Sequence, residues 1–278
     1  MSKVWLITGS SRGFGRELVK AALDKGDRVV ATARRPEMLD DLVRLYGDQI
    51  RTYALDVTDA VAAKNAVSFT VEEFGTLDVV VNNAGYADSA PIEEMSDGMF
   101  RAQIEANLFG VVNVTKAALP ILRKKRSGHM IQFSSIGGRV GGTPGMGAYQ
   151  TAKYAVEGFS EVLNNEVSPL GIKVIIVEPG GFRTDWNGSS MRKLSVSADY
   201  EDTVGATNRF RDSFEGNQPG DPVRGAKIVV DLVRMEEPPL RMLLGSDAVE
   251  MAATSSKART EEAEKWAELS RSADYPKS

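Results

Sequence analysis

The chain has 278 residues, of which 42% are hydrophobic and 26% charged, and its formal net charge of −4 is made of mixed signs. These values are typical of one α/β domain, and they do not indicate a general nucleic-acid surface. The chain has no cysteine and one histidine, His129, which excludes disulfides and thiol catalysis and leaves a metal site without its usual ligands. Because no apolar run is long enough to span a bilayer and Met1–Thr8 lacks the features of a signal peptide, we expect a cytoplasmic protein without membrane contact.

Apolar runs of strand length alternate with amphipathic segments of helix length through most of the chain. We predict strands at Val4–Thr8, Arg28–Ala33, Arg51–Leu55, Val79–Asn82, Met130–Ser134, Lys173–Glu178 and Arg241–Leu244. We predict helices at Gly13–Lys25, Pro36–Leu45, Ala60–Phe74, Met99–Leu122, Ala148–Val167 and Pro222–Arg234, the last with Asp221 as its N-cap. The alternation predicts one doubly wound α/β domain over residues 1–278, with a parallel sheet of about seven strands and helices on both faces.

Three segments depart from this alternation. Gly137–Gly147 is punctuated by glycine and proline, which predicts an open loop. Residues 186–220, from Trp186 to Gly220, are polar and contain glycines, and we expect a loop or lid over a binding site, although some insertions of this kind have no fixed structure. In a C-terminal extension over residues 247–278, Lys257–Leu269 is rich in Glu, Ala and Lys and carries Trp266. We expect a solvated helix there, with an oligomer contact as the alternative.

A glycine-rich turn follows the first strand and opens the first helix. Its glycines permit close approach of a ligand to the backbone, and the helix N-terminus offers amide protons to a pyrophosphate. The spacing of the glycines, G-x-x-x-G-x-G, differs from the commoner dinucleotide motif G-x-G-x-x-G, although the same physical mechanism of phosphate binding applies. The alternative is a glycine-rich turn that binds no ligand. The candidate residues for binding the cofactor here are Gly9, Ser11, Arg12, Gly13, Phe14 and Gly15.

The end of the second strand indicates which dinucleotide binds. An NAD site usually has a carboxylate there, about 20 residues after the glycines. This chain instead has Arg34 and Arg35, and a guanidinium group can form a bidentate hydrogen bond with a phosphate. Arg34 and Arg12 therefore predict the 2′-phosphate of NADP, so NADP(H) is favoured over NAD(H). The alternative is a solvated arginine pair at the start of a helix.

Two serines end the fifth predicted strand, and the next predicted helix carries Tyr149 and Lys153. These two residues are four apart, so a helix places them on one face. A nearby ammonium favours the phenolate, and the free phenol titrates near about 10, too high for proton transfer near neutrality without such help. Taken alone, the pair is more simply two ordinary residues of a helix surface.

Taken together and in this order, the motifs resemble the short-chain dehydrogenase/reductase family in its shorter, non-extended branch, and they are similar to its carbonyl reductases and hydroxysteroid dehydrogenases. The resemblance runs from Thr8 to about Thr184 and implies a single Rossmann-type domain. It rests on T-G-S-S-R-G-F-G at Thr8–Gly15, Asp56-Val57, N-N-A-G at Asn82–Gly85, Asn107, Ser135, Y-Q-T-A-K at Tyr149–Lys153 and P-G-G-F-R-T at Pro179–Thr184.

The resemblance implies four catalytic residues: Asn107, Ser135, Tyr149 and Lys153. Tyr149 would exchange a proton with the substrate oxygen, which Ser135 would polarise. Lys153 would lower the pKa of Tyr149 and hold the nicotinamide ribose, and Asn107 would support a water that links Lys153 to solvent. Ser135 lies 14 residues before Tyr149, one more than is usual in the family, and Ser134 is the fallback.

The resemblance also implies further contacts with the cofactor. Asp56 is expected at the adenine and Thr184 at the nicotinamide carboxamide. In addition to these cofactor contacts, Asp56 could cap the next helix, and Pro179-Gly180 could form the turn that ends the strand. The residues expected at the cofactor beyond the glycine turn are Arg34, Asp56, Val57, Asn82, Asn83, Ala84, Gly85, Tyr149, Lys153, Pro179, Gly180 and Thr184.

We therefore predict an NADP(H)-dependent oxidoreductase that interconverts a ketone or aldehyde and an alcohol by hydride transfer. Trp186 and Met191, with Val140 and Met146 in the glycine-rich loop, suggest a hydrophobic substrate, and the alternative is that these side chains serve only in packing. The alternatives are a non-catalytic NADP-binding regulator and an epimerase or dehydratase like those of the extended relatives. The resemblance further implies a homodimer or homotetramer formed through the helices Met99–Leu122 and Ala148–Val167.

Overall fold

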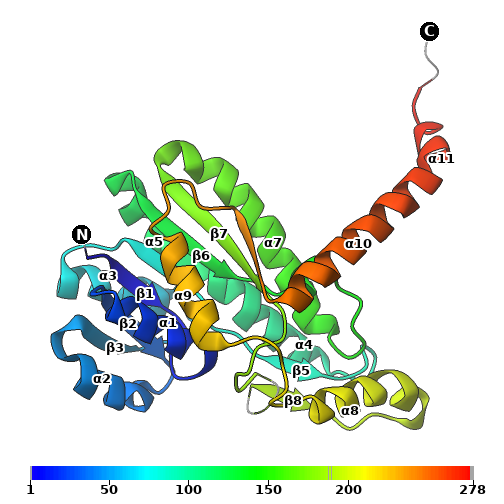
Figure 1. The fold of residues 1–278 in the computed structure, drawn as a ribbon, viewed down its shortest axis with the longest axis horizontal. Coiled ribbons are helices and arrows are strands. Elements are labelled where there is room, and N and C mark those ends of the chain that lie inside the picture. The colour runs from blue at the N-terminus through cyan, green and yellow to red at the C-terminus, as the bar shows by residue number, and fades with distance from the viewer. Residues whose placement is uncertain (1, 187, 189, 276–278) are drawn as a thin grey trace.

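A computed structural model describes residues 2–186, 188 and 190–275 of the chain. Its centre is a seven-stranded parallel sheet with the strand order β3-β2-β1-β4-β6-β7-β9 (Figure 1). The strands are β1 (Val4–Ile7), β2 (Arg28–Ala33), β3 (Ile50–Ala54), β4 (Val79–Asn82), β6 (Gly128–Phe133), β7 (Ile172–Pro179) and β9 (Arg241–Leu244). The predicted doubly wound sheet is confirmed. Because the strand order reverses between β1 and β4, a crevice opens beyond their carboxyl ends.

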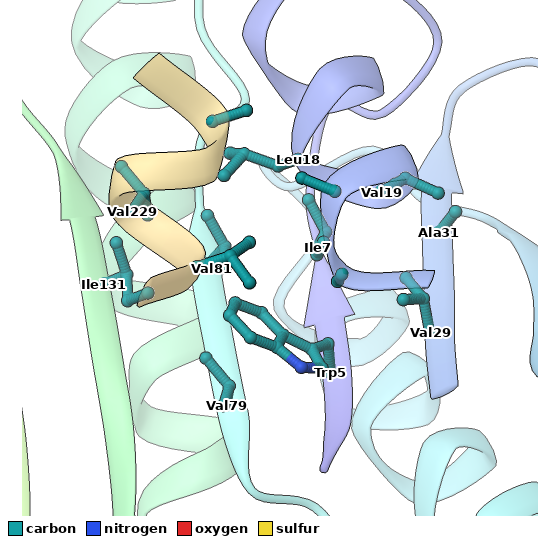
Figure 2. Close-up of a cluster of buried hydrophobic side chains, with 14 of the residues drawn as sticks. Trp5, Ile7, Leu18, Val19, Val29, Ala31, Val79, Val81, Ile131 and Val229 are labelled. Atoms are coloured by element: carbon teal, nitrogen blue, oxygen red, sulfur yellow. The ribbon is translucent and has the colours of Figure 1, made fainter. Parts of the chain in front are cut away.

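Helices cover both faces of the sheet, since successive strand residues point to opposite sides. One apolar layer joins Trp5 and Ile7 of β1 to Leu18 and Val229 of the covering helices (Figure 2). The opposite layer contains Val4 and Leu6 of the same strand. The helices over the first layer are α1 (Gly13–Asp24), α2 (Asp40–Tyr46) and α9 (Pro222–Leu232), and those over the second are α3 (Ala60–Phe74), α5 (Gly110–Lys125) and α7 (Gly147–Val167).

The helix predicted at Met99–Leu122 is longer than expected and is not uniform. It consists of α4 (Asp97–Ile104), a π-helical turn at Glu105–Phe109 and α5. π-helical turns inside helices are frequent at functional sites. Asn107 lies in this turn and is fully buried.

The segment predicted to be a loop or lid, residues 186–220, is called the lid segment here, and its described part contains short elements of regular structure. It contains β8 (Met191–Lys193), a 3₁₀ turn at Ala198–Tyr200, a π-helical turn at Glu201–Gly205 and α8 (Ala206–Ser213). β8 pairs in parallel with β5 (Ala87–Ser89), which follows β4. The lid segment is therefore attached to the carboxyl edge of the main sheet.

Other boundaries also differ from the prediction. The expected open loop Gly137–Gly147 includes part of a short helix, α6 (Ile136–Arg139). Pro36–Leu45 is a 3₁₀ turn, Pro36–Leu39, followed by α2, and two further 3₁₀ turns lie at Gly47–Gln49 and Ser168–Leu170. Asp221 does cap α9, since its carboxylate accepts a hydrogen bond from the Val223 amide at 2.8 Å.

The C-terminal helix starts well before Lys257. It runs as α10 (Ser246–Lys265), and α11 (Ala267–Arg271) follows after a break at Trp266. Ala248 and Ala252 in its first turns are buried, and beyond them the helix extends away from the domain (Figure 1). In the described part of the chain, none of the helices has both the length and the hydropathy needed to cross a membrane.

Candidate active site

One cavity of about 790 Å³ opens at the carboxyl edge of the sheet and contains most of the predicted site. The predicted residues that line it are Gly9, Ser11, Arg12, Gly13, Phe14, Arg34, Asp56, Val57, Asn83, Ala84, Gly85, Ser135, Tyr149, Lys153, Pro179, Gly180 and Thr184. Gly15, Asn82 and Asn107 are absent from the lining. The fold therefore brings the glycine turn and the Tyr149–Lys153 helix into the same crevice.

The glycine turn packs too tightly for side chains at two of its positions. Gly9 has a φ of +67°, and a β-carbon there would lie 2.8 Å from the Cα of Ala84. A β-carbon at Gly15 would overlap the carbonyl oxygen of Gly9. Gly15 thus holds the start of α1 against the turn, which explains why it does not face the cavity.

The N-terminus of α1 is suited to an anion. Arg12 occupies the N-cap position without a capping side-chain hydrogen bond, and the first turn has no acidic residue. The amides of this turn have no intrahelical acceptor, and the helix dipole adds partial positive charge at the same place. The residues around this end of the cavity therefore fit the pyrophosphate of a dinucleotide.

Thr8 and Asn83 tie the glycine turn to the end of β4. The Thr8 hydroxyl accepts hydrogen bonds from the amides of Asn83 (3.0 Å) and Ala84 (3.1 Å), and the Asn83 side chain donates to the carbonyl of Thr8 at 3.0 Å. Sequence reasoning missed this role of Thr8, because a threonine at a strand end also suits an ordinary strand.

Asn82 differs from its expected role beside the cofactor. It is buried in β4, and its side chain donates to Thr115 (3.0 Å) and Gln132 (2.9 Å), away from the cavity. The reason is the alternation of a strand, which points neighbouring side chains in opposite directions. Asn83, the next residue, lines the cavity instead.

Asp56 lies at the cavity and is not a helix cap. Its carboxylate accepts hydrogen bonds from the amide (3.0 Å) and the hydroxyl (2.8 Å) of Thr58, which fixes its orientation. The cap of α3 is Asp59, which accepts from the amides of Val61 and Ala62. Asp56 is therefore available on the cavity wall that would hold an adenosine.

The candidate catalytic side chains meet where α7 passes the end of β6. The Lys153 ammonium donates to the carbonyl oxygen of Phe133 at 2.7 Å and lies 5.7 Å from the centre of the Tyr149 ring. The Ser135 hydroxyl accepts from the Gly137 amide at 3.0 Å and lies beside the phenol. On its other side the Tyr149 ring packs on Trp186 of the lid segment, with 5.0 Å between the ring centres.

Burial controls the titration of both Tyr149 and Lys153. It raises the pKa of Tyr149 to about 12, and hydrogen bonding by Ser135 and the charge of Arg211 act in the opposite direction. Burial lowers the pKa of Lys153 to about 8, and the charge of Glu157 opposes this. The expected lowering of the Tyr149 pKa by Lys153 is therefore not seen here, since the groups that favour the phenolate are Ser135 and Arg211.

Asn107 lies behind the cavity wall. Its side-chain amide donates to the carbonyls of Tyr86 and Gln103, both at 2.9 Å, and its oxygen accepts from the Tyr86 amide at 3.2 Å. A β-carbon at Gly85 would overlap the Asn107 oxygen and would lie 3.8 Å from the Lys153 ammonium. Gly85 therefore lies close to both Asn107 and Lys153, and a side chain at this position would collide with Asn107.

The cavity, the glycine turn and the serine–tyrosine–lysine cluster agree with a comparison against known families. The family model of the short chain dehydrogenases matches residues 3–195. This chain belongs to the short-chain dehydrogenase family. Over 271 residues it is 51% identical to the oxidoreductase BOA17 of Botryotinia fuckeliana, covering 97% of this chain and 98% of that protein. The chain is accordingly an oxidoreductase of this family.

Comparison with solved structures also places the chain in the short-chain dehydrogenase family. A short-chain dehydrogenase from Streptomyces avermitilis superposes with a TM-score of 0.92 at 38% identity, and the match covers 98% of each chain. An alcohol dehydrogenase from the archaeon Thermococcus sibiricus, complexed with 5-hydroxy-NADP, superposes with a TM-score of 0.72 at 26% identity, covering 88% of this chain and 96% of that one. The arrangement of the whole sheet and its helices is therefore that of known members of the family.

The structure of this short-chain dehydrogenase adds residues to the site that the sequence did not single out. Tyr86 and Gln218 line the cavity, and Gln218 is 3% exposed although it lies in a polar stretch of sequence. The charge of Arg211 on α8 acts to lower the pKa of Tyr149. None of the three belongs to a motif: Tyr86 directly follows Asn82–Gly85, and Arg211 and Gln218 belong to the lid segment.

Proposed function

We propose that this short-chain dehydrogenase is an NADP(H)-dependent oxidoreductase that interconverts a ketone or aldehyde and an alcohol. The observation that carries the proposal is the single cavity that joins the glycine turn to Ser135, Tyr149 and Lys153. A cavity of about 790 Å³ has room for a nucleotide and a small substrate together. Proton-transfer groups that share a crevice with a dinucleotide cradle suit hydride chemistry at a carbonyl.

The proposed binding of NADP(H) is based on the residues that line the cavity. When bound, NADP(H) supplies or accepts the hydride. The open N-terminus of α1 would hold its pyrophosphate, and Asp56 and Val57 would lie along the adenosine. Arg12 and Arg34 both line the cavity, and their guanidinium groups favour a 2′-phosphate. The NADP analogue bound by the archaeal alcohol dehydrogenase supports this choice.

The proton-transfer part assigns a role to each side chain of the cluster. The Tyr149 phenol would give its proton to the substrate oxygen, and the Ser135 hydroxyl would donate a hydrogen bond to the same oxygen as negative charge develops. Lys153 would stabilise that charge and hold the nicotinamide ribose. Asn107 would act through Lys153 by positioning a water, and the closeness of Gly85 to both residues supports this arrangement.

The substrate side of the cavity is apolar. Tyr149 clusters with Ala87, Met146 and Met191, and Trp186 packs against this cluster. Such a wall favours a hydrophobic carbonyl or alcohol substrate, because binding removes apolar surface from water. Because Trp186 and Met191 belong to the lid segment, we propose that this segment covers the substrate during turnover.

The test is consumption of NADPH with a panel of aliphatic, aromatic and polycyclic ketones, run in parallel with NADH. Turnover of at least one ketone, faster with NADPH, is the expected result. Binding of NADPH, measured by fluorescence, without turnover of any ketone or oxidation of any alcohol would contradict the proposal and favour an NADP-binding regulator.

We also propose a homo-oligomer formed through the outer faces of α4–α5 and α7. Phe109, in the turn between α4 and α5, is 45% exposed, and Val162 on α7 is 58% exposed, and an interface through these helices would cover both side chains. Light scattering at micromolar concentration should give a dimer or tetramer, and a monomer would contradict this assignment. The cytoplasmic location stays a prediction from the sequence.

A further inference from the structure

Residues 180–184, called the 180–184 loop here, directly follow β7 and form part of the cavity wall. Gly180, Gly181, Phe182 and Thr184 all line the cavity. In the proposed binding mode this wall lies against the nicotinamide, because Thr184 is expected at its carboxamide. Two successive glycines give the loop little conformational restraint of its own, so contacts from other segments must fix its position.

The end of the lid segment holds one side of the 180–184 loop. The Gly220 amide donates to the carbonyl of Gly181 at 2.9 Å, and the Arg183 amide donates to the carbonyl of Gly220 at 3.0 Å. The Arg183 side chain adds a hydrogen bond to the Gln218 carbonyl at 2.7 Å. These bonds use the carbonyl of Gly181 and leave its N–H group to a partner from another part of the chain.

The Gly181 N–H group donates to a carboxylate of the C-terminal extension. Asp247, in the first turn of α10, accepts this hydrogen bond through Oδ2 at 2.6 Å. The two residues are 66 positions apart in the chain, so the bond is a tertiary contact. A hydrogen bond to a charged acceptor is about twice as strong as one between neutral groups. Asp247 therefore restrains the 180–184 loop from the side opposite to the lid segment's contribution to the chain.

The Asp247 carboxylate is enclosed by glycines. A β-carbon at Gly180 would overlap the carboxylate, and one at Gly245 would lie 2.6 Å from Oδ1. The Oδ1 atom is buried and has no hydrogen-bond partner among the described residues. Because an enclosed oxygen without a partner lowers stability, the carboxylate is not placed here for the benefit of the fold alone. Such departures from optimal stability are expected at functional positions.

The start of α10 is fixed to the domain. Ala248 and Ala252 are buried in a cluster with Ile136 of α6, which follows the strand that ends at the site. Asp247 thus has a firm base, and its bond to Gly181 connects the loop to that base. Asp247 does not line the cavity, so any effect on the cofactor must pass through the 180–184 loop.

We propose that Asp247 is a positioning residue for hydride transfer, whose carboxylate holds the 180–184 loop in the position that binds the nicotinamide half of the cofactor. This inference rests on the proposed function and gives a role to a segment beyond residues 3–195, the part that the family model matches. Without the bond to Gly181, the loop would occupy the binding position only part of the time. The apparent affinity for the dinucleotide would fall with that fraction.

The test separates the two halves of the cofactor. Wild-type enzyme, Asp247→Ala, Asp247→Asn and the control Glu250→Ala are titrated by calorimetry with whichever of NADPH and NADH wild-type enzyme binds more tightly. They are also titrated with the adenosine half of that cofactor, which is adenosine 2′,5′-bisphosphate for NADPH and AMP for NADH. Glu250 is an exposed carboxylate near the start of the same helix and does not line the cavity.

Asp247→Ala should bind the dinucleotide about 10- to 150-fold more weakly, the factor that corresponds to loss of one charge-assisted hydrogen bond. Its affinity for the adenosine half should equal that of wild-type enzyme. Asp247→Asn keeps an oxygen that can accept from Gly181 and should lie between the two, and Glu250→Ala should match wild-type enzyme in both titrations. Unchanged dinucleotide binding in Asp247→Ala would overturn the proposal, and so would equal weakening of the dinucleotide and of its adenosine half.

Denaturant unfolding of the same proteins without ligand distinguishes positioning from a purely structural role. Asp247→Ala loses one hydrogen bond but also an enclosed oxygen without a partner, so its unfolding midpoint should stay close to that of wild-type enzyme. A midpoint so low that the variant is partly unfolded during the titration would overturn the proposal, because Asp247 would then serve the fold. Neither experiment uses a substrate, so both results stand even if no carbonyl compound is turned over.

Discussion

The Lys153 ammonium donates a 2.7 Å hydrogen bond to the carbonyl oxygen of Phe133, the last residue of β6. This bond joins α7, which carries Tyr149, to the strand that leads into Ser135. The relative positions of Tyr149 and Ser135 are therefore held by this bond and not by the number of residues between them. The unusual 14-residue separation of Ser135 and Tyr149 is therefore compatible with the site. Part of the connection is taken up by α6, whose first turn is capped by the Ser135 hydroxyl.

Replacement of Tyr149 by Phe should remove catalysis and leave the cofactor bound. The variant keeps the ring that packs on Trp186 but loses the proton donor, so we expect kcat to fall by roughly 10²- to 10⁴-fold. Steady-state reduction of the best ketone measures kcat, and fluorescence titration measures the Kd for NADPH.

Tyr154→Phe is the matched control for this experiment. Tyr154 lies on the same helix, but its hydroxyl donates to the Arg139 carbonyl and accepts from Arg259, outside the cavity lining. It should retain nearly full activity. Near-normal turnover in Tyr149→Phe would refute the role assigned to the phenol.

The rate of carbonyl reduction should decrease as the pH rises through about 8. Burial lowers the pKa of Lys153 from 10.5 to about 8, so its ammonium, which stabilises developing negative charge, loses its proton in this range. The charge of Glu157 raises this pKa. Glu157→Gln should therefore move the alkaline limb of the kcat profile to lower pH.

Glu161→Gln serves as the control for this pH profile. Glu161 is one helical turn beyond Glu157 and shares its partner Arg241, but no influence of Glu161 on Lys153 is found. The control should leave the alkaline limb in place. An unchanged profile in Glu157→Gln, or a shift to higher pH, would exclude the assignment of this limb to Lys153.

The sheet and the place of the glycine turn in the cavity could be predicted from the sequence because each depends on local signals. Buried parallel strands give continuous apolar runs, and a glycine turn is recognisable when a strand precedes it and a helix follows. The bounds of β2, β4 and β9 agree with the prediction at both ends. Gly9, Gly13 and Thr184 lie in one cavity as expected.

The substrate half could not be predicted in the same way, because tertiary contacts determine it. β8 has three residues and forms only by pairing with β5, about a hundred positions earlier in the chain. The packing of α8 on β5 depends on the hydrogen bond between Asn208 and Ser89, which are more than a hundred positions apart in the chain. In α8 the large apolar residue Phe210 is 65% exposed and the polar residue Asn208 is buried, so hydrophobicity does not mark the buried side of this helix.

Arg34 should determine the preference for NADPH over NADH. Arg34 directly follows β2 and lines the cavity, whereas its neighbour Arg35, which is exposed as well, does not line the cavity. Loss of a bond between a guanidinium and the 2′-phosphate should weaken NADPH binding about 10- to 150-fold in Arg34→Ala, and NADH binding should be unaffected.

Arg35→Ala removes the same charge from the adjacent position and is the control for Arg34→Ala. It should change neither Kd, as measured by fluorescence titration with both cofactors. If the two variants weaken NADPH binding equally, the effect comes from general surface charge and not from a phosphate contact. If Arg34→Ala weakens NADH as much as NADPH, Arg34 does not recognise the 2′-phosphate.

His129 should make the fold sensitive to mild acid. Its side chain on β6 is 8% exposed, and neither ring nitrogen has a hydrogen-bond partner among the described residues. Burial, with the charges of Lys3 and Lys173, lowers its pKa from 6.5 to about 4. Between these two values the unfolded chain binds a proton that the folded chain does not, so stability is lost as the pH falls from 6.5 towards 4.

His129→Leu tests this linkage through the difference between two proteins. At pH 5 the histidine should cost wild-type enzyme about 2 kcal/mol of unfolding free energy relative to pH 7, in addition to the loss from its carboxylates. The variant keeps those carboxylates and loses only the titrating ring, so its decrease should be smaller by this amount. Denaturant unfolding at both pH values gives the four free energies, and an equal acid-induced loss in the two proteins would show that His129 is protonated in the folded state.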